Sequence, residues 1–152
     1  MATRSNIAYK TAEGKIRAAY CHYDGYTSNN GEILRRFYTD ADKVKTLVDL
    51  GSMSFLAAKV FPTKPGHSFD TPEAGVVVFY NRDRGEGWDI TSWKEYDDFA
   101  EYVADGEEYM YFFNGTDWLV NDHGETDDNG NAVFDYVDTV INPSIVDQLF
   151  GE

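Results

Sequence analysis

The latter part of the chain combines regularly spaced aromatic residues with a strong excess of acid. Residues 95–152 contain sixteen Asp and Glu residues and not one Lys or Arg. Within this acidic stretch, aromatic side chains alternate with other residues at Tyr109, Tyr111 and Phe113. A disordered acidic tail lacks the aromatic and branched residues that offset the loss of chain entropy on folding. We therefore expect residues 95–152 to fold and to present a negatively charged surface.

The length and composition predict one globular domain. A chain of 152 residues can bury about two thirds of its unfolded surface in a single core. Hydrophobic residues at 42% and aromatic residues at 16% exclude disorder, and no apolar run has the length of a membrane span. The first residues show no secretory signal, and the lone Cys21 cannot form an internal disulfide. We expect a cytoplasmic protein.

The net charge of -14 is concentrated in one half of the sequence. Residues 1–75 contain ten Lys/Arg and eight Asp/Glu, whereas residues 76–152 contain three and nineteen. Solubility of a small domain requires a net charge of only about 2 to 8 in magnitude. A field of this sign repels nucleic acid and anionic membranes, and it speeds encounters with basic protein surfaces.

The first half has the signals of a β-hairpin followed by two helices. Residues 6–10 and 15–23 resemble strands joined by a loop of hairpin length. A short helix is predicted to begin near Asn30, and a second to begin with a capping box at residues 39–42 and to end at Gly51. The predicted apolar stripes of these helices comprise Ile33, Leu34, Phe37, Val44, Leu47 and Val48.

The middle of the chain is less regular. Prolines and glycines predict an ordered loop over residues 51–75. The apolar run at residues 76–80 predicts a strand that is covered on both faces, hence the central strand, and residues 81–87 predict a polar turn. A capping box followed by helical spacing predicts a helix over residues 93–104.

Two Asn-Gly dipeptides, at 114–115 and 129–130, predict an antiparallel meander. Asn-Gly supplies the positive φ angles that two-residue hairpin loops need. Pro143 predicts the start of a short terminal helix. The predicted fold class is α+β, a mostly antiparallel sheet with three or four helices in a single domain. The three predicted strands of the meander cover residues 107–113, 116–121 and 132–138.

Residues with catalytic potential do not form a motif. Cys21 and His22 are adjacent on a strand, so their side chains point to opposite faces and cannot act as nucleophile and base. A single Cys is more often a small buried hydrophobe. No metal-ligand spacing is found among the potential ligands, so we predict no catalytic residue, metal or cofactor. Those potential ligands are His22, Asp24, His67, Asp122 and His123.

Residues 125–130 match the first half of a calcium loop. Oxygen-bearing side chains stand at the first, third and fifth places, and Gly130 stands at the sixth. The twelfth place is Tyr136, where a bidentate Glu is required. The hairpin turn already explains the Asn-Gly pair, so any cation site here is expected to be of low affinity.

A rigid surface with the charge of DNA can occupy the basic cleft of a nucleic-acid-binding protein. Duplex DNA carries one negative charge per ~1.7 Å of its axis. We predict that the helix at residues 93–104 and the meander hold carboxylates at fixed spacing, and that binding weakens with salt. Tyr and Trp residues among the acids would provide desolvated anchors. The predicted interface comprises Glu95, Asp97, Asp98, Glu101, Asp105, Glu107, Glu108, Asp117, Asp122, Glu125, Asp127 and Asp128.

The first half of the sequence contains most of the residues that resemble a known family. The sequences TRSNIA at residues 3–8, YCHYDGY at residues 20–26 and Asn30-Gly31 resemble a family of small phage and prophage accessory proteins, over about a third of the chain. Members often have Pro after DGY, where this chain has Thr27. The resemblance implies a phage protein acting in the cytoplasm of an infected bacterium, with no catalytic residues to carry over. Together with the charge it predicts a non-enzymatic inhibitor that binds a host or bacterial defence protein, and neither nucleic acid nor membrane directly.

Two alternatives remain open from the sequence. The first is a protein that sequesters a nucleotide signal, with arginines on the phosphates and tyrosines stacked on the bases. The second is an enzyme that uses Asp24 or His22 in the loop after the second strand. The alternative ligand-binding set comprises Arg4, Arg17, Tyr20, His22, Tyr23, Asp24, Tyr26, Arg35 and Arg36.

Overall fold

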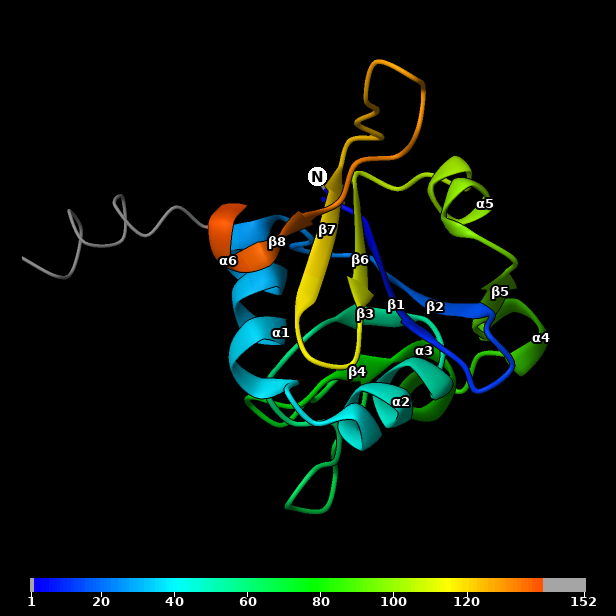
Figure 1. Cartoon of the computed structure of the whole chain (residues 1–152). Helices are drawn as coiled ribbons and strands as arrows, with labels where there is room; N and C mark the ends of the chain where they lie inside the picture. The colour runs from blue at the N-terminus through cyan, green and yellow to red at the C-terminus, as the bar shows by residue number, and fades with distance from the viewer. Residues whose placement is uncertain (1, 141–152) are drawn as a thin grey trace, which may run out of the picture.

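Eight strands form one mostly antiparallel sheet (Figure 1). The computed structural model describes residues 2–140. The strand order is β4-β3-β2-β1-β6-β7-β8, and β5 also pairs with β2. The predicted α+β class is confirmed. The strands are β1 (Ser5–Lys10), β2 (Ile16–Cys21), β3 (Met53–Phe55), β4 (Val78–Phe79), β5 (Lys94–Tyr96), β6 (Tyr109–Phe113), β7 (Trp118–Asp122) and β8 (Asp135–Tyr136).

The helices are short. The described residues contain six α-helices and one π-helical turn, where the sequence predicted three or four helices. The predicted polar turn at residues 81–87 is in part helical, because α3 occupies it until Gly85 ends the helix with a φ of 78°. The helical elements are η1 (Thr27–Gly31), α1 (Glu32–Phe37), α2 (Ala41–Asp49), α3 (Tyr80–Arg84), α4 (Trp88–Thr91), α5 (Phe99–Ala104) and α6 (Val137–Val140).

The predicted opening hairpin forms the middle of the sheet. β1 and β2 pair antiparallel from Ser5↔Cys21 to Lys10↔Ile16, and Gly14 has the positive φ of 85° that the connecting loop requires. β6 lies parallel to β1 on its other side. Because β6 belongs to the acidic half of the sequence and β1 to the near-neutral half, the two halves share one sheet.

The predicted meander is confirmed as β6-β7-β8. Its first loop contains four residues rather than two, since Phe113 pairs with Trp118. The Asn114 side-chain oxygen accepts the backbone N–H groups of Thr116 and Asp117 at 2.9 and 2.7 Å. Asn114 thus closes the loop with its side chain, while Gly115 takes a φ of 101°.

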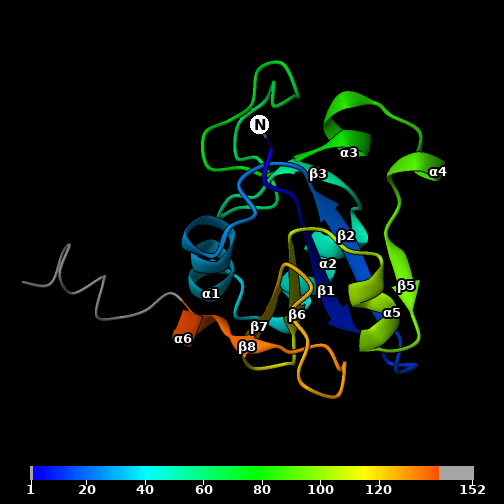
Figure 2. The ribbon, with the colours of Figure 1, turned by 90° about the horizontal axis from the view of Figure 1, so that it is seen from above.

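Helices cover the two faces of the sheet unequally (Figure 2). One face packs against α1 and α2 in the larger core, which includes Ile7, Cys21 and Tyr111. The opposite face packs against α5 in a smaller core around Tyr102. The predicted stripes of α1 and α2 are buried at Leu34, Val44, Leu47 and Val48, whereas Phe37 is 43% exposed. Tyr38 takes its place in the core and donates a hydrogen bond to the Ala57 carbonyl.

The prediction of a central strand at residues 76–80 is wrong. Only Val78–Phe79 is a strand, and it lies at the edge of the sheet beyond β3. Residues 76–79 are nevertheless buried. β3 covers one side of β4, so part of the loop predicted over residues 51–75 is a strand. The rest of the burial comes from the loop after β3, where Lys59 bridges Val76, and from α3, whose Arg82 bonds the Val77 carbonyl.

The predicted helix at residues 93–104 is also wrong in its first half. Residues 94–96 form β5, which pairs with β2 from Ile16↔Tyr96 to Ala18↔Lys94. The helix begins after Asp98, whose side chain accepts the Glu101 N–H at 2.9 Å. Strand pairing with β2 overrides the local helix signal. At α2 likewise the N-cap is Asp40, one residue after the predicted Thr39.

Within residues 2–140 no helix has the length and apolar character needed to cross a membrane. The terminal helix predicted at Pro143 lies outside the described residues.

Candidate functional site

The carboxylates of the predicted interface divide between the two ends of the sheet. One group comes from the turn between α5 and β6, from the end of β7 and from the loop between β7 and β8, which Figure 1 shows extending beyond the sheet. Glu95 and Asp97 lie in or just after β5, which pairs with residues 16–18 near the other end of β1 and β2. Asp117 also lies at that other end. It belongs to the loop at the Phe113↔Trp118 end of the β6-β7 hairpin, whereas Asp122 is at the Tyr109↔Asp122 end.

Glu95 is neutralised by an arginine of β2. The Arg17 guanidinium lies 2.9 Å from both Glu95 Oε2 and Asp49 Oδ1, and it stacks 3.8 Å from the centroid of the Trp93 ring. The side chain of Arg17 is only 18% exposed. Arg17 therefore joins β2, β5 and α2, and Glu95 has little remaining charge to offer a partner.

Two other acids near α5 also have cationic neighbours. Asp97 forms an ion pair with Lys15 from the opening hairpin. Asp105 accepts a hydrogen bond from the Tyr96 hydroxyl, and Lys94 Nζ lies 3.9 Å from its Oδ2. The acidic stretch, which contains no Lys or Arg after Lys94, is thus partly balanced by basic residues from elsewhere in the sequence.

A second group of acids, here named the acidic end, is compensated less directly. Among the described residues, no Lys or Arg forms an ion pair with any member of this group. His123 lies beside Asp122 and 3.8 Å from Glu108, and the Asp127 side chain accepts the N–H groups of Asn129 and Asn131 at the loop tip. The acidic end comprises Glu107, Glu108, Asp122, Glu125, Asp127 and Asp128.

Aromatic contacts connect α5 to the loop that carries half of the acidic end. The Phe99 ring lies 4.9 Å from the Phe112 ring and 5.1 Å from the Phe134 ring, centroid to centroid. Phe99 remains 40% exposed. The charged loop is therefore held against the sheet, and an apolar side chain is exposed beside it. An exposed aromatic residue next to charged groups is a common anchor in protein interfaces.

The structure places the residues of the alternative ligand-binding set in separate parts of the fold. Tyr20, His22 and Tyr23 are in contact, with the Tyr20 hydroxyl 2.6 Å from His22 Nδ1 and the His22 and Tyr23 rings 4.5 Å apart. Arg17 points to the other face of β2, toward Asp49.

The remaining members of that set lie elsewhere. Arg35 and Arg36 are on α1, where Arg35 pairs with Glu32 and with Asp138. Of the four arginines, Arg4 is the one whose charge acts on the Tyr20 phenol. Asp24 has a positive φ of 58° in the loop after β2, and the Tyr26 side chain is 39% exposed there.

Cys21 is a structural residue. Its side chain is fully buried, and Asn30 Nδ2 donates to its Sγ at 3.5 Å. Burial raises the pKa of the Cys21 thiol to about 11, so the reactive thiolate is scarce at neutral pH. Among residues 2–140 no three His, Cys, Asp or Glu side chains are placed to share a metal ion.

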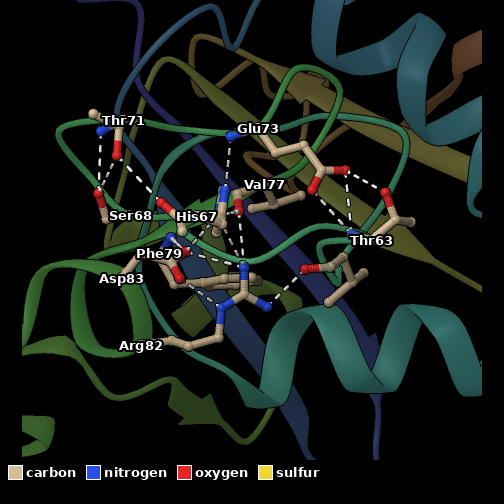
Figure 3. Close-up of polar contacts among 11 residues, drawn as sticks. Thr63, His67, Ser68, Thr71, Glu73, Val77, Phe79, Arg82 and Asp83 are labelled. Atoms are coloured by element: carbon tan, nitrogen blue, oxygen red, sulfur yellow. Dashed lines mark hydrogen bonds and ion pairs between the residues drawn. The ribbon is translucent and has the colours of Figure 1, made fainter.

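A polar network that no pattern in the sequence predicts organises residues 61–75 (Figure 3). The Arg82 guanidinium donates to the carbonyls of Val60 and Val77 at 2.7 and 3.0 Å and to the Asp83 carboxylate at 2.8 Å. Asp83 is 4% exposed and also accepts the Phe79 N–H. Burial opposes ionisation of Asp83, but the bonds from Arg82 and Phe79 outweigh it and hold the pKa of Asp83 below its usual value.

His67 belongs to the same network. Its Nδ1 accepts the Glu73 N–H at 2.9 Å, so the proton of the neutral ring is on Nε2, which faces the Val77 carbonyl at 3.2 Å and Asp83 at 3.3 Å. The ring is buried, with 3% of its side chain exposed. His67 therefore connects the loop to α3 rather than facing a ligand.

The Glu73 carboxylate closes the loop, and we expect it to make the stability of the fold depend on pH. The Thr63 hydroxyl, the Lys64 and Thr63 N–H groups and the charge of Lys59 lower the pKa of Glu73 to about 2. Its contribution is present above the ordinary pKa of a Glu and is lost as the pH falls through the folded-state value. We expect Glu73→Gln to reduce the decrease in the urea midpoint between about pH 4.5 and pH 2. Asp70→Asn, at an exposed residue of the same loop, is the control and should leave that decrease unchanged.

Comparison of the chain with protein-family models, with curated proteins and with solved structures finds no match. The function is therefore argued from the geometry of the chain itself.

Proposed function

We propose that the protein is a non-enzymatic binding protein whose acidic end docks onto a cationic surface of a protein partner. The observation that supports this proposal is the contrast between the two groups of acids. Glu95, Asp97 and Asp105 have basic neighbours from distant parts of the sequence, whereas no Lys or Arg of the described residues pairs with the acidic end. Like charges gathered at one end of a sheet repel one another, and a cationic partner relieves that repulsion.

The scaffold favours recognition of a fixed arrangement of positive charges. Asp122 pairs with Tyr109 across β6 and β7, Glu108 directly precedes Tyr109, and the Phe99–Phe134 contact fixes the adjacent loop. Carboxylates on a rigid frame lose little entropy on binding. This favours a partner whose own positive charges are rigidly placed, as in the DNA-binding cleft of an enzyme or repressor.

The specific form of the proposal is a phage-encoded inhibitor that mimics DNA. It would act in the cytoplasm of the infected bacterium on a host or defence protein. The resemblance of residues 3–8 and 20–26 to phage accessory proteins supports a phage origin. The negative charge supports a basic protein as the target. A protein that sequesters nucleotides would need its arginines and tyrosines together, and Arg17, Arg35 and Arg36 lie away from Tyr20.

The test is neutralisation of the acidic end at side chains with no structural role. Glu125 and Asp128 of the acidic end are exposed, as is Asp135, which follows the same loop on β8. We expect the triple variant Glu125→Gln, Asp128→Asn, Asp135→Asn to bind its partner ~tenfold more weakly, because each exposed ion pair contributes roughly 0.2–1 kcal/mol. Binding is measured by capture from bacterial lysate at low salt, and then with the captured protein purified.

A matched control distinguishes the effect of where the charges lie from the effect of the total net charge on binding. Glu13→Gln, Asp42→Asn, Asp70→Asn removes the same three charges from exposed positions elsewhere and should retain binding. Wild-type binding should be lost at high salt and competed by duplex DNA. Equal losses in the two triple variants, or binding that is insensitive to both salt and DNA, would refute the proposal.

A further inference from the structure

A gap in the sheet creates a pocket beside the acidic end. Two short strands share the outer edge of β2: β5 pairs with residues 16–18, and β3 pairs only at Cys21. The edge of β2 between these two pairings has no strand partner among the described residues. A pocket of about 280 Å³ lies at this gap.

The floor and walls of the pocket come from different elements. Asn6 and Tyr20, which face each other across β1 and β2, line it from the sheet. Lys94 and Tyr96 of β5 line one wall, and Asp105 and Glu107 from the turn between α5 and β6 line another. α5 does not close the pocket, because it packs farther along the same face over Phe112.

The charges around the pocket are unequal. Its two carboxylates face one ammonium group, that of Lys94, whose side chain is 72% exposed and free to turn outward. A shallower hollow adjoins it, shares Lys94, Tyr96 and Asp105, and adds Glu101 to the acids. The pocket thus lies in a locally negative part of the surface.

Glu107 is the least compensated of these carboxylates. It is half-buried, and no hydrogen bond to its side chain is found among the described residues. Burial raises the pKa of Glu107, and the charge of Arg4 offsets this only in part. A partly desolvated carboxylate without a donor gains more from an added cation than an exposed carboxylate does.

We propose that this pocket binds an ammonium or guanidinium group, with Glu107 as its counter-ion and the rings of Tyr20 and Tyr96 as its aromatic walls. Aromatic rings attract cations through their negative faces. The volume lies just below the ~300–1,000 Å³ of pockets that enclose drug-sized ligands, so it fits one side chain or a small amine. The inference rests on the proposed function for the source of the cation, which is an Arg or Lys side chain of the basic partner.

The test uses a cation and its neutral isostere. Nα-acetyl-arginine amide and Nα-acetyl-citrulline amide differ at the guanidinium alone, and calorimetric titration of each into the full chain measures binding. We expect saturable binding of the arginine derivative and none of the citrulline derivative. Glu107→Gln should weaken binding about tenfold or more, whereas the neighbouring Glu108→Gln, which does not line the pocket, should have less than about a twofold effect.

The variant Lys94→Met tests the direction in which the affinity changes when a positive charge is removed from the pocket. Removal of this ammonium group should tighten binding of the arginine derivative, because Lys94 competes with the ligand for the carboxylates of the pocket. The proposal is overturned by absence of saturable binding, by equal binding of citrulline, by an unchanged affinity in Glu107→Gln, or by weaker binding in Lys94→Met. Circular dichroism of each variant checks that it is folded.

Two further measurements distinguish the source of the cation and separate this inference from the proposed function. If Glu107→Gln also weakens capture of the partner, the cation is a partner side chain. If Glu107→Gln leaves capture of the partner unchanged but weakens binding of agmatine and of the arginine derivative, the pocket binds a free small amine. The triple variant of Glu125, Asp128 and Asp135 should bind the arginine derivative normally, because none of these residues lines the pocket.

Discussion

Replacement of Arg82 by alanine is expected to lower the free energy of unfolding by about 3 kcal/mol or more. The Asp83 carboxylate would remain 4% exposed without its ion-pair partner, and an uncompensated buried charge of this kind costs roughly 3–5 kcal/mol. The Val60 carbonyl would also lose its donor, and the Val77 carbonyl would keep only that of His67. The Arg82 guanidinium is 22% exposed, which places the expected loss toward the lower limit of that range.

The measurement is urea unfolding, with limited proteolysis of residues 61–75 as a local readout. Arg84→Ala is the matched control, since Arg84 is 52% exposed and its Nε lies 3.5 Å from Glu86. An exposed pair of this kind contributes at most about 1 kcal/mol. In Arg82→Met/Asp83→Asn the buried charge is gone, and the double variant should be more stable than Arg82→Ala. Equal losses in Arg82→Ala and Arg84→Ala would show that the network does not stabilise the fold.

Substitution of Gly51 by alanine is the other change with a large expected effect. Gly51 ends α2 with a φ of 88°, and a Cβ there would collide with the Thr91 carbonyl oxygen and the Trp88 ring. The same carbonyl accepts the Ser52 N–H at 2.7 Å, so any movement of Thr91 weakens that bond. A left-handed conformation costs a residue with a Cβ roughly 1–2 kcal/mol, and a lost hydrogen bond adds about 1 kcal/mol. We expect Gly51→Ala to lose about 3 kcal/mol.

Gly14→Ala isolates the conformational part of that loss. Gly14 has a nearly identical φ of 85°, but no atom lies within 4 Å of where its Cβ would be. Its substitution should cost only the ~1–2 kcal/mol of the backbone conformation. Thermal unfolding of the two variants gives the cost of the collision as the difference between them. Similar losses would mean that α4 moves freely away from Gly51.

Elements with local signals were predicted well. The opening hairpin, α2 and the β6-β7-β8 meander each have a turn or cap residue at their ends, and their apolar residues follow one period. The errors arose where burial or pairing came from distant segments. The run at residues 76–80 has the composition of a central strand, but its strand lies at the edge of the sheet, and β3, the loop after β3 and α3 bury residues 76–79. Helical spacing after Trp93 was overridden by pairing of β5 with β2.

The candidate site shows the same division. The sequence predicted an acidic surface but could not show which acids are neutralised, because the pairing residues are far apart in the chain, as with Arg17 and Glu95, 78 residues apart. It also missed the Arg82 network, in which Arg82 bonds two backbone carbonyls besides the Asp83 carboxylate. Carbonyl acceptors are present at every residue and leave no trace in the side-chain pattern.

The sequence by itself determined the sign of the surface, the fold class and the positions of the turns, because charge, strand alternation and the turn preference of Asn-Gly are local properties of the chain. The tertiary structure alone decided where that charge is uncompensated and where a pocket opens. Both depend on which strands pair along the edge of β2. Packing between segments tens of residues apart decides that pairing.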